Sequence, residues 1–410
     1  MSVKEAPSLA DEVVAWFTDT AARQDPWAFF DRLRSGDPVH RCDELNTWVV
    51  TRYDDGDEVF RNSPVVRTPE GSDMSYMYGE DGELRPTWKL DRGTHRWHEG
   101  EDLARIRRLV TQVMNPRSIR SWRDQMQAIL DEKVAALRGR KEMDLVADFV
   151  YELPMHMICD VFGVPLSDHE NYKRWTEQWF AGVVFVTDPE VQKTADAAAE
   201  AYAAHVMELV EFKRGRPDES MLSLLIRARD EGDKLSDDEL VSMTTSMIGA
   251  GHETTGSQVG NAAYALLRNP DQLKLLRRSP DLAVDAMEEA LRYESSAMLT
   301  PRYAVEAFEL NGRTINEGDA IQILIQATGR SPDTFPEPGR YWIERPEKKH
   351  LAFALGPHFC CGAQLARLEG QLMLRALATE FPGLKLETDE VTYKPILGIG
   401  GLESLPVSWN

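Results

Sequence analysis

Residues 353–362 read Phe-Ala-Leu-Gly-Pro-His-Phe-Cys-Cys-Gly, and a helical pattern follows at once from Gly362 to Arg367. Glycine and proline shape a turn that holds two adjacent cysteines at the start of this helix. The free N–H groups and the positive dipole end of a helix favour the thiolate form of a cysteine placed there. A thiolate is a ligand that iron accepts. A pair of buried cysteines near a helix cap is the structural alternative, and the segment alone leaves it open.

The longest predicted helix carries a second motif. It begins with the capping box Ser236-Asp-Asp-Glu239 and continues to about Arg268, where Asn269-Pro270 ends it and caps the next helix. About 32 residues span roughly 48 Å, so we expect this helix to pass through the middle of the protein.

Midway along this helix the sequence reads Ala250-Gly-His-Glu-Thr-Thr255, and Gly249 precedes it. Each glycine costs a helix roughly 1 kcal/mol relative to alanine, so mid-helix glycines usually mark a close approach by another group. That group is either a second helix, with Thr254 bonding back to the carbonyl of Ala250, or a flat ligand.

An acid–base pair lies between these two segments. Glu289 and Arg292 share one face of a helix predicted to run from Ser279-Pro280 to about Tyr293. Pairs of this kind are common on helix surfaces and contribute about 0.2–0.5 kcal/mol. Alone, the pair indicates nothing about function.

The cysteine segment resembles the haem-binding signature of the cytochrome P450 family, Phe-Gly-x-Gly-x-His-x-Cys-x-Gly. The matching residues are Phe353, Gly356, His358, Cys360 and Gly362. Ala354 departs from the first glycine of the signature, so the turn must accept a Cβ atom there. The resemblance implies that Cys360 ligates the iron of a haem b group, because Cys361 falls on the variable position.

The motif of the central helix resembles the oxygen-activation motif of the same family, Ala-Gly-x-Asp/Glu-Thr. The resemblance implies that the haem lies against Ala250 and Gly251. It also implies that Thr254 orients iron-bound dioxygen and water, while Glu253 helps to relay protons. Cleavage of the O–O bond needs two protons delivered in a controlled way, which explains a hydroxyl beside a carboxylate.

The pair Glu289–Arg292 resembles the family's Glu-x-x-Arg. The resemblance implies that the pair is buried and that it holds the cysteine face through a third arginine, either Arg340 or Arg345. We therefore expect its role to be structural.

By position, Arg107, Arg302 and His358 resemble the residues that anchor the haem propionates in this family, since propionates need cationic or hydrogen-bonding partners. Leu103 departs from the pattern, because the family usually has histidine four residues before this arginine. His95 and His98 in the preceding loop are the candidate replacements.

By family position, the substrate pocket draws on aromatic and apolar side chains, which suggests a sizeable hydrophobic or aromatic ligand. Aromatic side chains more often belong to the core. The candidates are Met74, Tyr76, Tyr78, Trp88, Trp97, Phe180, Val184, Met247, Gly251, Met298, Leu299 and Ile399.

The composition limits the possible partners. The 68 acidic residues outnumber the 47 basic ones, giving a formal net charge of −21. This charge disfavours nucleic acid and anionic membrane surfaces. No apolar stretch is long enough for a membrane span and no signal core is recognisable, so we expect a cytoplasmic protein.

The periodicity predicts a mainly α protein with a minor β region, and the resemblance implies the cytochrome P450 fold, with its long central helix over a buried haem. With no linker or repeat, we expect one domain over residues 1–410, its first 20 or so residues irregular. Amphipathic stretches occupy residues 9–35 and residues 63–98 read as a loop. A strand is expected at Thr47–Tyr53 and a hairpin on Asn311-Gly312. Further helices are expected at 101–114, 117–137, 143–162, 168–184, 189–214 and 362–381.

The resemblance covers roughly residues 100–405 and implies a haem-thiolate monooxygenase that oxidises a small molecule with dioxygen, as a secondary-metabolite tailoring step. Electrons must come from outside, because the chain has no flavin, nicotinamide or iron–sulfur motif. A ferredoxin with its reductase is the expected donor to a monomeric enzyme. An acidic ferredoxin would dock on a basic set near the cysteine face, although scattered solvated charges are the alternative. This set consists of Arg105, Arg108, Arg117, Arg120, Arg123 and Lys349.

Three other functions are compatible with a bound haem. A haem-binding sensor and a peroxide-driven enzyme are both disfavoured, because neither needs the acid–alcohol pair Glu253–Thr254. Oxidative ring coupling, or another atypical oxidation at the same haem, stays open as an alternative to hydroxylation. A zinc enzyme is excluded by the absence of any His/Cys cluster with zinc spacing.

Overall fold

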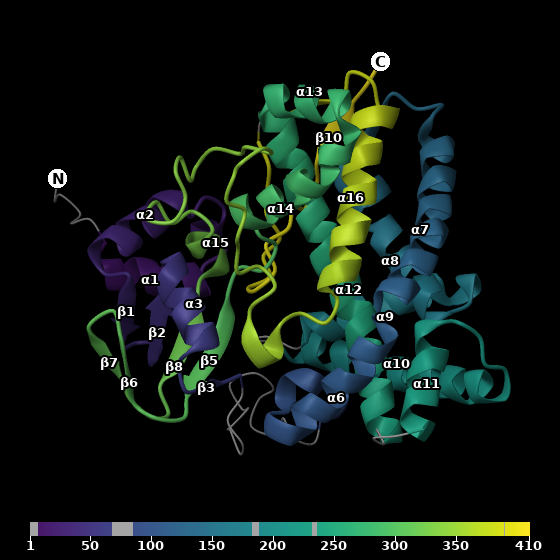
Figure 1. Cartoon of the computed structure of the whole chain (residues 1–410), viewed down its shortest axis with the longest axis horizontal. Helices are drawn as coiled ribbons and strands as arrows, with labels where there is room; N and C mark the ends of the chain where they lie inside the picture. The colour runs from purple at the N-terminus through teal and green to yellow at the C-terminus, as the bar shows by residue number, and fades with distance from the viewer. Residues whose placement is uncertain (1–6, 68–84, 183–187, 232–235, 389) are drawn as a thin grey trace.

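The computed structural model describes residues 7–67, 85–182, 188–231, 236–388 and 390–410. Figure 1 shows most helices gathered on one side of the molecule and the main sheet on the other, beside the N-terminal helices. The predicted class, mainly α with a minor β region, is confirmed. Among the described residues, no helix combines the length and apolar character needed to cross a membrane.

Helix α12 (Asp237–Arg268) passes through the middle of the helical side, as predicted (Figure 1). Its capping box is present: the Ser236 hydroxyl accepts from the Glu239 N–H at 3.0 Å, and the Glu239 carboxylate accepts from the Ser236 N–H at 2.7 Å. Most of α12 is buried against α8, α10, α14 and α16.

The helices around α12 follow the sequence pattern closely. The predicted segments are helical within a few residues at each end, and amphipathic faces pack them on the central core. They are α6 (Gly100–Val113), α7 (Pro116–Leu137), α9 (His169–Ala181), α10 (Pro189–Gly215), α13 (Pro270–Arg278), α14 (Ala283–Tyr293) and α16 (Ala363–Glu380). Helix α11 (Met221–Glu231) was not predicted.

The helix predicted at 143–162 is wrong in its first part. Residues Glu142–Asp144 form strand β4, a π-helical turn covers Val146–Val150, and only Glu152–Phe162 is α-helical (α8). Strand β4 pairs antiparallel with β10 (Pro406–Ser408), which pairs in turn with β9 (Lys385–Leu386). Pairing with a strand so distant in sequence overrides the local pattern.

The main sheet has the order β1-β2-β8-β5-β3, with β2 and β8 parallel and the other pairs antiparallel. The strand predicted from Thr47 ends at Val50, because α3 begins at Tyr53. The elements of this side are β1 (Val39–Cys42), β2 (Thr47–Val50), α3 (Tyr53–Arg61), β3 (Val65–Val66), β5 (Thr300–Ala304), β8 (Ala320–Ile323) and α15 (Ile325–Thr328).

Two expectations for the N-terminal third need correction. Among the described residues, Leu9–Thr18 is not irregular but forms helix α1, which is capped by Ser8 and buries Val13 and Trp16; α2 (Trp27–Gly36) follows. The expected loop at 63–98 contains β3 and helix α5 (Pro86–Arg92), which packs against α10 and α12. Buried contacts of this kind are not visible in the local pattern.

The predicted Asn311-Gly312 hairpin is confirmed. Strands β6 (Phe308–Leu310) and β7 (Arg313–Ile315) pair in antiparallel register, and both turn residues have positive φ, 49° and 72°. Positive φ at both positions is what a tight two-residue turn requires.

Candidate active site

The cysteine segment forms a tight turn that runs directly into α16. The Cys360 N–H donates to the Phe353 carbonyl at 2.9 Å, which closes the turn. Ala354 accepts a positive φ of 53° in place of the glycine of the signature, so the chain does tolerate a Cβ atom at this position. At Gly356, with φ of 71°, a Cβ atom would lie 2.7 Å from the Phe60 carbonyl oxygen, so this position requires glycine.

The surroundings of Cys360 do not favour its thiolate by themselves. Burial raises the pKa of Cys360 to about 11, as does the neighbouring Cys361. A backbone hydrogen bond from Gly362 and the charges of Arg107 and Arg367 act in the opposite direction without offsetting burial. In the polypeptide alone, burial therefore outweighs the stabilisation that the start of the helix gives to the thiolate. The positive charge of a bound metal ion is what would make the sulfur a thiolate.

Buried guanidinium groups gather beside this turn. Arg67 and Arg302 both donate to the Thr300 hydroxyl, at 3.1 and 3.4 Å. Burial lowers the pKa of Arg67 to about 10 and that of Arg302 to about 9, with further lowering by charged arginine neighbours. Within the part of the chain that is described, neither guanidinium forms an ion pair. Two buried cations without a carboxylate suit an anionic ligand.

Histidines border the same cationic group. His95 is desolvated and close to Arg67, His358 and Arg107, so its pKa is lowered to about 3 and it is neutral. Its Nδ1 atom is buried without a hydrogen-bond partner, and the same holds for Nε2 of His98. His95 is therefore the candidate replacement for the histidine absent at Leu103 that lies beside the arginines Arg67 and Arg107. Leu103 is buried, so it contributes packing alone.

His358 has a carboxylate partner that the sequence did not indicate. Its Nε2 atom lies 2.8 Å from Oε1 of Glu99, and the same oxygen accepts from the backbone N–H of Arg67 at 2.6 Å. Burial lowers the pKa of His358, whereas Glu99 acts to raise it. The Nδ1 atom of His358 is buried and unpartnered.

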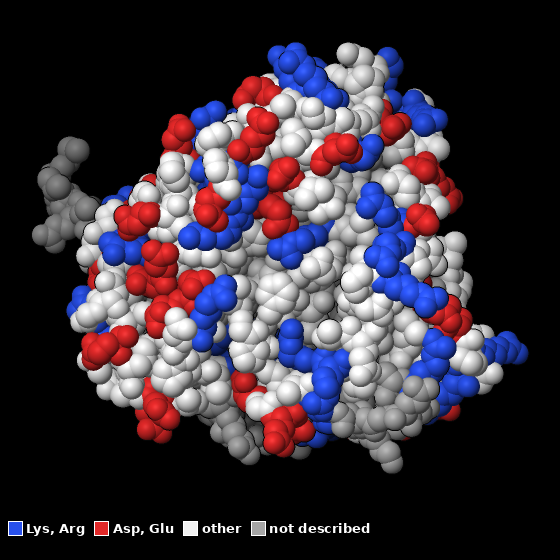
Figure 2. Space-filling view, in the orientation of Figure 1, with Lys and Arg blue, Asp and Glu red and all other residues white. Residues whose placement is uncertain are grey.

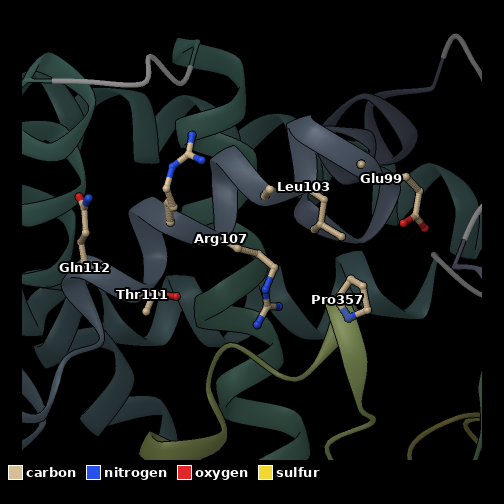
Figure 3. A pocket seen from close by; sticks show the side chains of 9 residues that line it. Glu99, Leu103, Arg107, Thr111, Gln112 and Pro357 are labelled. Atoms are coloured by element: carbon tan, nitrogen blue, oxygen red, sulfur yellow. The ribbon is translucent and has the colours of Figure 1, made fainter. Parts of the chain in front are cut away.

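A pocket of about 750 Å³ opens between α6 and the cysteine turn. Figure 3 shows the Arg107 side chain reaching from α6 toward Pro357. Arg107 donates to the Phe359 carbonyl at 2.7 Å and lies 3.5 Å from the Cys361 sulfur, so it joins α6 to the turn. The pocket is lined by Glu99, Gly100, Leu103, Ala104, Arg107, Arg108, Thr111, Gln112 and Pro357.

The middle of α12 has one open side. Ala250 is exposed, and Met247 and Thr254 are partly so, although most of α12 is buried. These positions recur at helical spacing and therefore form one strip. The Thr254 hydroxyl donates to the Ala250 carbonyl at 2.6 Å.

The glycines of the motif do not face this strip. A Cβ atom at Gly249 would lie 3.0 Å from the Phe180 ring, and one at Gly251 would lie 3.2 Å from Ile158. The glycines thus permit close crossing of α9 and α8, and Ala250 is the residue that faces open space. Close packing of neighbouring helices, rather than contact with a flat ligand, therefore accounts for Gly249 and Gly251.

Glu253 is buried on a different side of the helix from the open strip. Its Oε1 atom accepts from Lys394 Nζ at 2.9 Å and from the Tyr151 hydroxyl at 3.1 Å. The Tyr151 hydroxyl also lies 2.6 Å from the Ser257 hydroxyl. The sequence did not identify Lys394, because it is far along the chain in a segment without a motif.

Glu289 and Arg292 form a fully buried ion pair with two hydrogen bonds of 2.7 and 2.8 Å. Arg345 supplies the third partner, since its Nε atom lies 3.1 and 3.2 Å from the two Glu289 oxygens. Arg340 is half exposed and pairs with Glu337 instead. The three buried residues tie α14 to the chain that leads to the cysteine turn.

The expected substrate-pocket residues fall into separate environments. The rings of Trp88 and Trp97 pack edge to face with their centroids 4.8 Å apart, and Phe180 packs on α12 at Gly249. Met298 is buried, and Leu299 packs against the same N-terminal core. Ile399 is bridged to Ala297. Met74, Tyr76, Tyr78 and Val184 lie outside the described residues.

The six residues of the predicted basic set also differ in their exposure and contacts. Arg108, Arg117, Arg120 and Arg123 are exposed on α6 and α7, where Figure 2 shows a concentration of basic side chains. Arg105 is engaged with Glu239 at 2.7 Å, and Lys349 lies over the Tyr53 ring.

These features fit a bound haem. An exposed helical strip, a cysteine in a constrained turn and desolvated cations are the surroundings that a flat, iron-containing dicarboxylate needs. The cations Arg67, Arg302 and Arg107 can hold carboxylates, and Cys360 can hold the metal.

Comparisons with known proteins agree with this geometry. The cytochrome P450 family model matches residues 93–398. Cytochrome P450 107B1 of Saccharopolyspora erythraea is 35% identical over 95% of this chain and 96% of its own length. The cytochrome P450 monooxygenase PikC of Streptomyces venezuelae is 34% identical over 94% and 91%.

The fold agrees as well. The crystal structure of P450BioI with an acyl carrier protein bearing hexadec-9Z-enoic acid superposes with a TM-score of 0.85 at 30% identity, covering 94% of this chain and 99% of that one. The match spans nearly the whole chain in both sequence and structure. The chain belongs to the cytochrome P450 family, whose members carry a haem cofactor and act as monooxygenases.

Proposed function

We propose that this chain is a haem-thiolate monooxygenase that holds haem b through Cys360 and oxidises a hydrophobic or aromatic small molecule in a secondary-metabolite tailoring step. The observation that carries the proposal is the placement of Cys360 in a closed turn beside the buried cation Arg302 and the partly buried cations Arg67 and Arg107.

The haem, when bound, supplies the iron at which dioxygen is activated with two electrons and two protons. The protein residues do the remaining work. Cys360 provides the sulfur ligand, and its N–H bond to Phe353 fixes the direction of that ligand. Arg67, Arg302 and neutral His95 can hold the carboxylates of the cofactor.

Thr254 and Glu253 divide the handling of protons. The Thr254 hydroxyl lies on the open strip of α12, where it can orient a water molecule or an oxygen ligand. Glu253 is buried behind it and can hold a proton destined for that side. The carboxylate must turn from its present partners before the proton moves.

Substrate class follows from the apolar and aromatic candidates Trp88, Trp97, Phe180 and Met247. Two relatives from Bacillus subtilis are named for biosynthesis, a biotin biosynthesis cytochrome P450 and the polyketide biosynthesis cytochrome P450 PksS, and this supports a tailoring role. The exposed arginines of α6 and α7 would receive an acidic ferredoxin, which passes electrons from its reductase to a monomeric, cytoplasmic enzyme.

The test uses the purified protein expressed with ample haem precursor. A thiolate-type ferrous–CO spectrum is expected, and candidate compounds should be screened for a spin-state change as they displace iron-bound water. Turnover with ferredoxin and reductase then separates an oxidase from a haem sensor. A colourless protein, or one that holds haem through imidazole, would contradict the proposal.

A further inference from the structure

The carboxylate of Glu253 accepts hydrogen bonds from two donors that come from distant parts of the chain. Lys394 comes from the C-terminal segment, Tyr151 from the start of α8, and Ser257 supports Tyr151 from the next turn of α12. The side chain of Glu253 is 7% exposed and that of Lys394 is 23% exposed, so this ion pair is largely desolvated. A pair in such an environment is much stronger than one at the surface.

Lys394 is itself fixed in two ways. Its Nζ atom lies 3.8 Å from the centre of the Tyr151 ring, a cation–π distance. The backbone N–H of Lys394 donates to the Gly401 carbonyl at 2.8 Å, and Tyr393 forms an antiparallel β-bridge with Leu402. Residues 393–402 therefore fold back on themselves. This doubled-back segment carries the ammonium group to α12.

The segment can approach α12 because position 401 is glycine. A Cβ atom at Gly401 would lie 2.3 Å from the Ser257 hydroxyl oxygen and 3.1 Å from the Tyr151 hydroxyl. The neighbouring Gly400 carbonyl accepts from Asn261 of α12 at 2.9 Å. The chain is therefore shaped to place Lys394 against Glu253.

Other charged groups face the same pair. Glu177 of α9 interacts through space with both members of the pair, and partial desolvation and the charge of Glu253 raise its pKa. Lys173, also on α9, acts on Glu177 and on His252. His252 is buried with both ring nitrogens unpartnered, and burial lowers its pKa to about 3, so it stays neutral. Lys394 is thus the one cation in direct contact with Glu253 among the described residues.

We propose that Lys394 is a positioning residue that holds the Glu253 carboxylate turned away from the open strip, so that Glu253 takes up and passes on a proton only when the Lys394 contact opens. The inference rests on the proposed monooxygenase function and adds that Lys394 controls the position of Glu253, the acid in that function. The Lys394 side chain is 23% exposed, so solvent reaches one member of the pair.

The test compares Lys394→Met and Lys394→Arg in the purified holoenzyme. Infrared difference spectra against Glu253→Gln isolate the protonated carboxyl band of Glu253 during a pH titration. Loss of an adjacent cation raises a buried carboxyl pKa by about 1–3 pH units. Lys394→Met should therefore shift the midpoint upward by about that amount, whereas Lys394→Arg should retain the wild-type midpoint.

A matched control is Lys385→Met, which removes a surface lysine paired with Glu387 and should leave the band unchanged. Thermal melting monitored by circular dichroism establishes that each variant is folded, and Lys394→Gln, which also removes the charge, replaces the methionine variant if that variant is not folded. In turnover, the pH optimum for product formation should shift in Lys394→Met and return in Lys394→Arg.

An unchanged Glu253 midpoint in folded Lys394→Met overturns the inference. So does a midpoint shift without any change in the pH profile of turnover. The proposed function would fail differently, through loss of the thiolate-type CO spectrum in the wild-type protein, and the infrared titration reports on Glu253 independently of that spectrum.

Discussion

Cys360 and Cys361 are adjacent, yet their contacts distinguish them. Cys360 receives a backbone hydrogen bond from Gly362, whereas Cys361 lies 3.5 Å from Arg107. Cys360→Ser should abolish the thiolate-type ferrous–CO spectrum, because a hydroxyl does not supply the same electron donation. Cys361→Ser should retain it. The reverse pattern of spectra would show that the assignment of the ligand is off by one residue.

Thr254 offers a second prediction at the same scale. Thr254→Ala removes the hydroxyl on the open strip and also a local bond to Ala250, and the helix tolerates alanine well. The variant should bind haem normally but lose product formation by about 10²-fold, because positioned proton transfer typically contributes that much or more. Peroxide released per NADPH consumed should rise. Unchanged coupling between NADPH and product would contradict the role of Thr254.

Among individual residues, sequence reasoning found those with a fixed place in a motif. Cys360, Glu253, Thr254 and Glu289 all lie on elements whose boundaries are visible locally. Partners brought in by tertiary folding were not found: Lys394 reaches Glu253 from 141 positions away. Arg67 and Glu99 were missed for the same reason, because Arg67 reaches Thr300 from 233 positions away and Glu99 reaches His358 from 259 positions away.

At the scale of elements, the Glu289–Arg292–Arg345 cluster joins α14 to the loop before the cysteine turn. Arg345 also donates to the carbonyls of Pro336, Glu337 and Arg340, so its removal takes one of two cations from the buried Glu289 carboxylate and breaks these three backbone contacts. Arg345→Ala should lower the free energy of unfolding by about 3–5 kcal/mol. Urea denaturation of the holoenzyme measures this.

Arg340→Ala is the matched control, because Arg340 forms a surface pair with Glu337. Surface pairs contribute about 0–1 kcal/mol, so this variant should unfold near the wild-type midpoint. Equal destabilisation by both substitutions would show that Arg345 is not the third member of the cluster.

Element boundaries followed local chemistry where caps were present. The capping box at Ser236, the Asn-Pro stops and the Asn-Gly turn fixed α12, α13 and the β6–β7 hairpin to within a residue or two. Strand β4 and helix α5 could not be predicted in this way. Their conformation depends on β10 and on α10, and no short window of sequence contains those partners.

At the scale of the whole molecule, charge is uneven: the net charge is −21, but α6 and α7 expose Arg108, Arg117, Arg120 and Arg123. The triple variant Arg117→Glu, Arg120→Glu, Arg123→Glu should slow reduction by an acidic ferredoxin at least about tenfold at low salt. Stopped-flow reduction followed as a function of ionic strength measures this.

Arg138→Glu, near the other end of α7, serves as the control, since Arg138 is exposed but lies beyond the basic concentration. It should leave the rate unchanged. A reduction rate that is indifferent to salt in the wild-type protein would favour the view that these arginines are only solvated surface charges.

The pairing of β4 with β10 also has a consequence for synthesis. Residues 393–410 supply the ammonium partner of Glu253, the strand that covers Asp144, and Trp409, which packs on Phe381. All of them leave the ribosome after the rest of the helices have emerged. A nascent chain stalled before residue 393 therefore exposes the apolar side of its helical core to chaperones, and the emergence of residues 393–410 is the step that covers it.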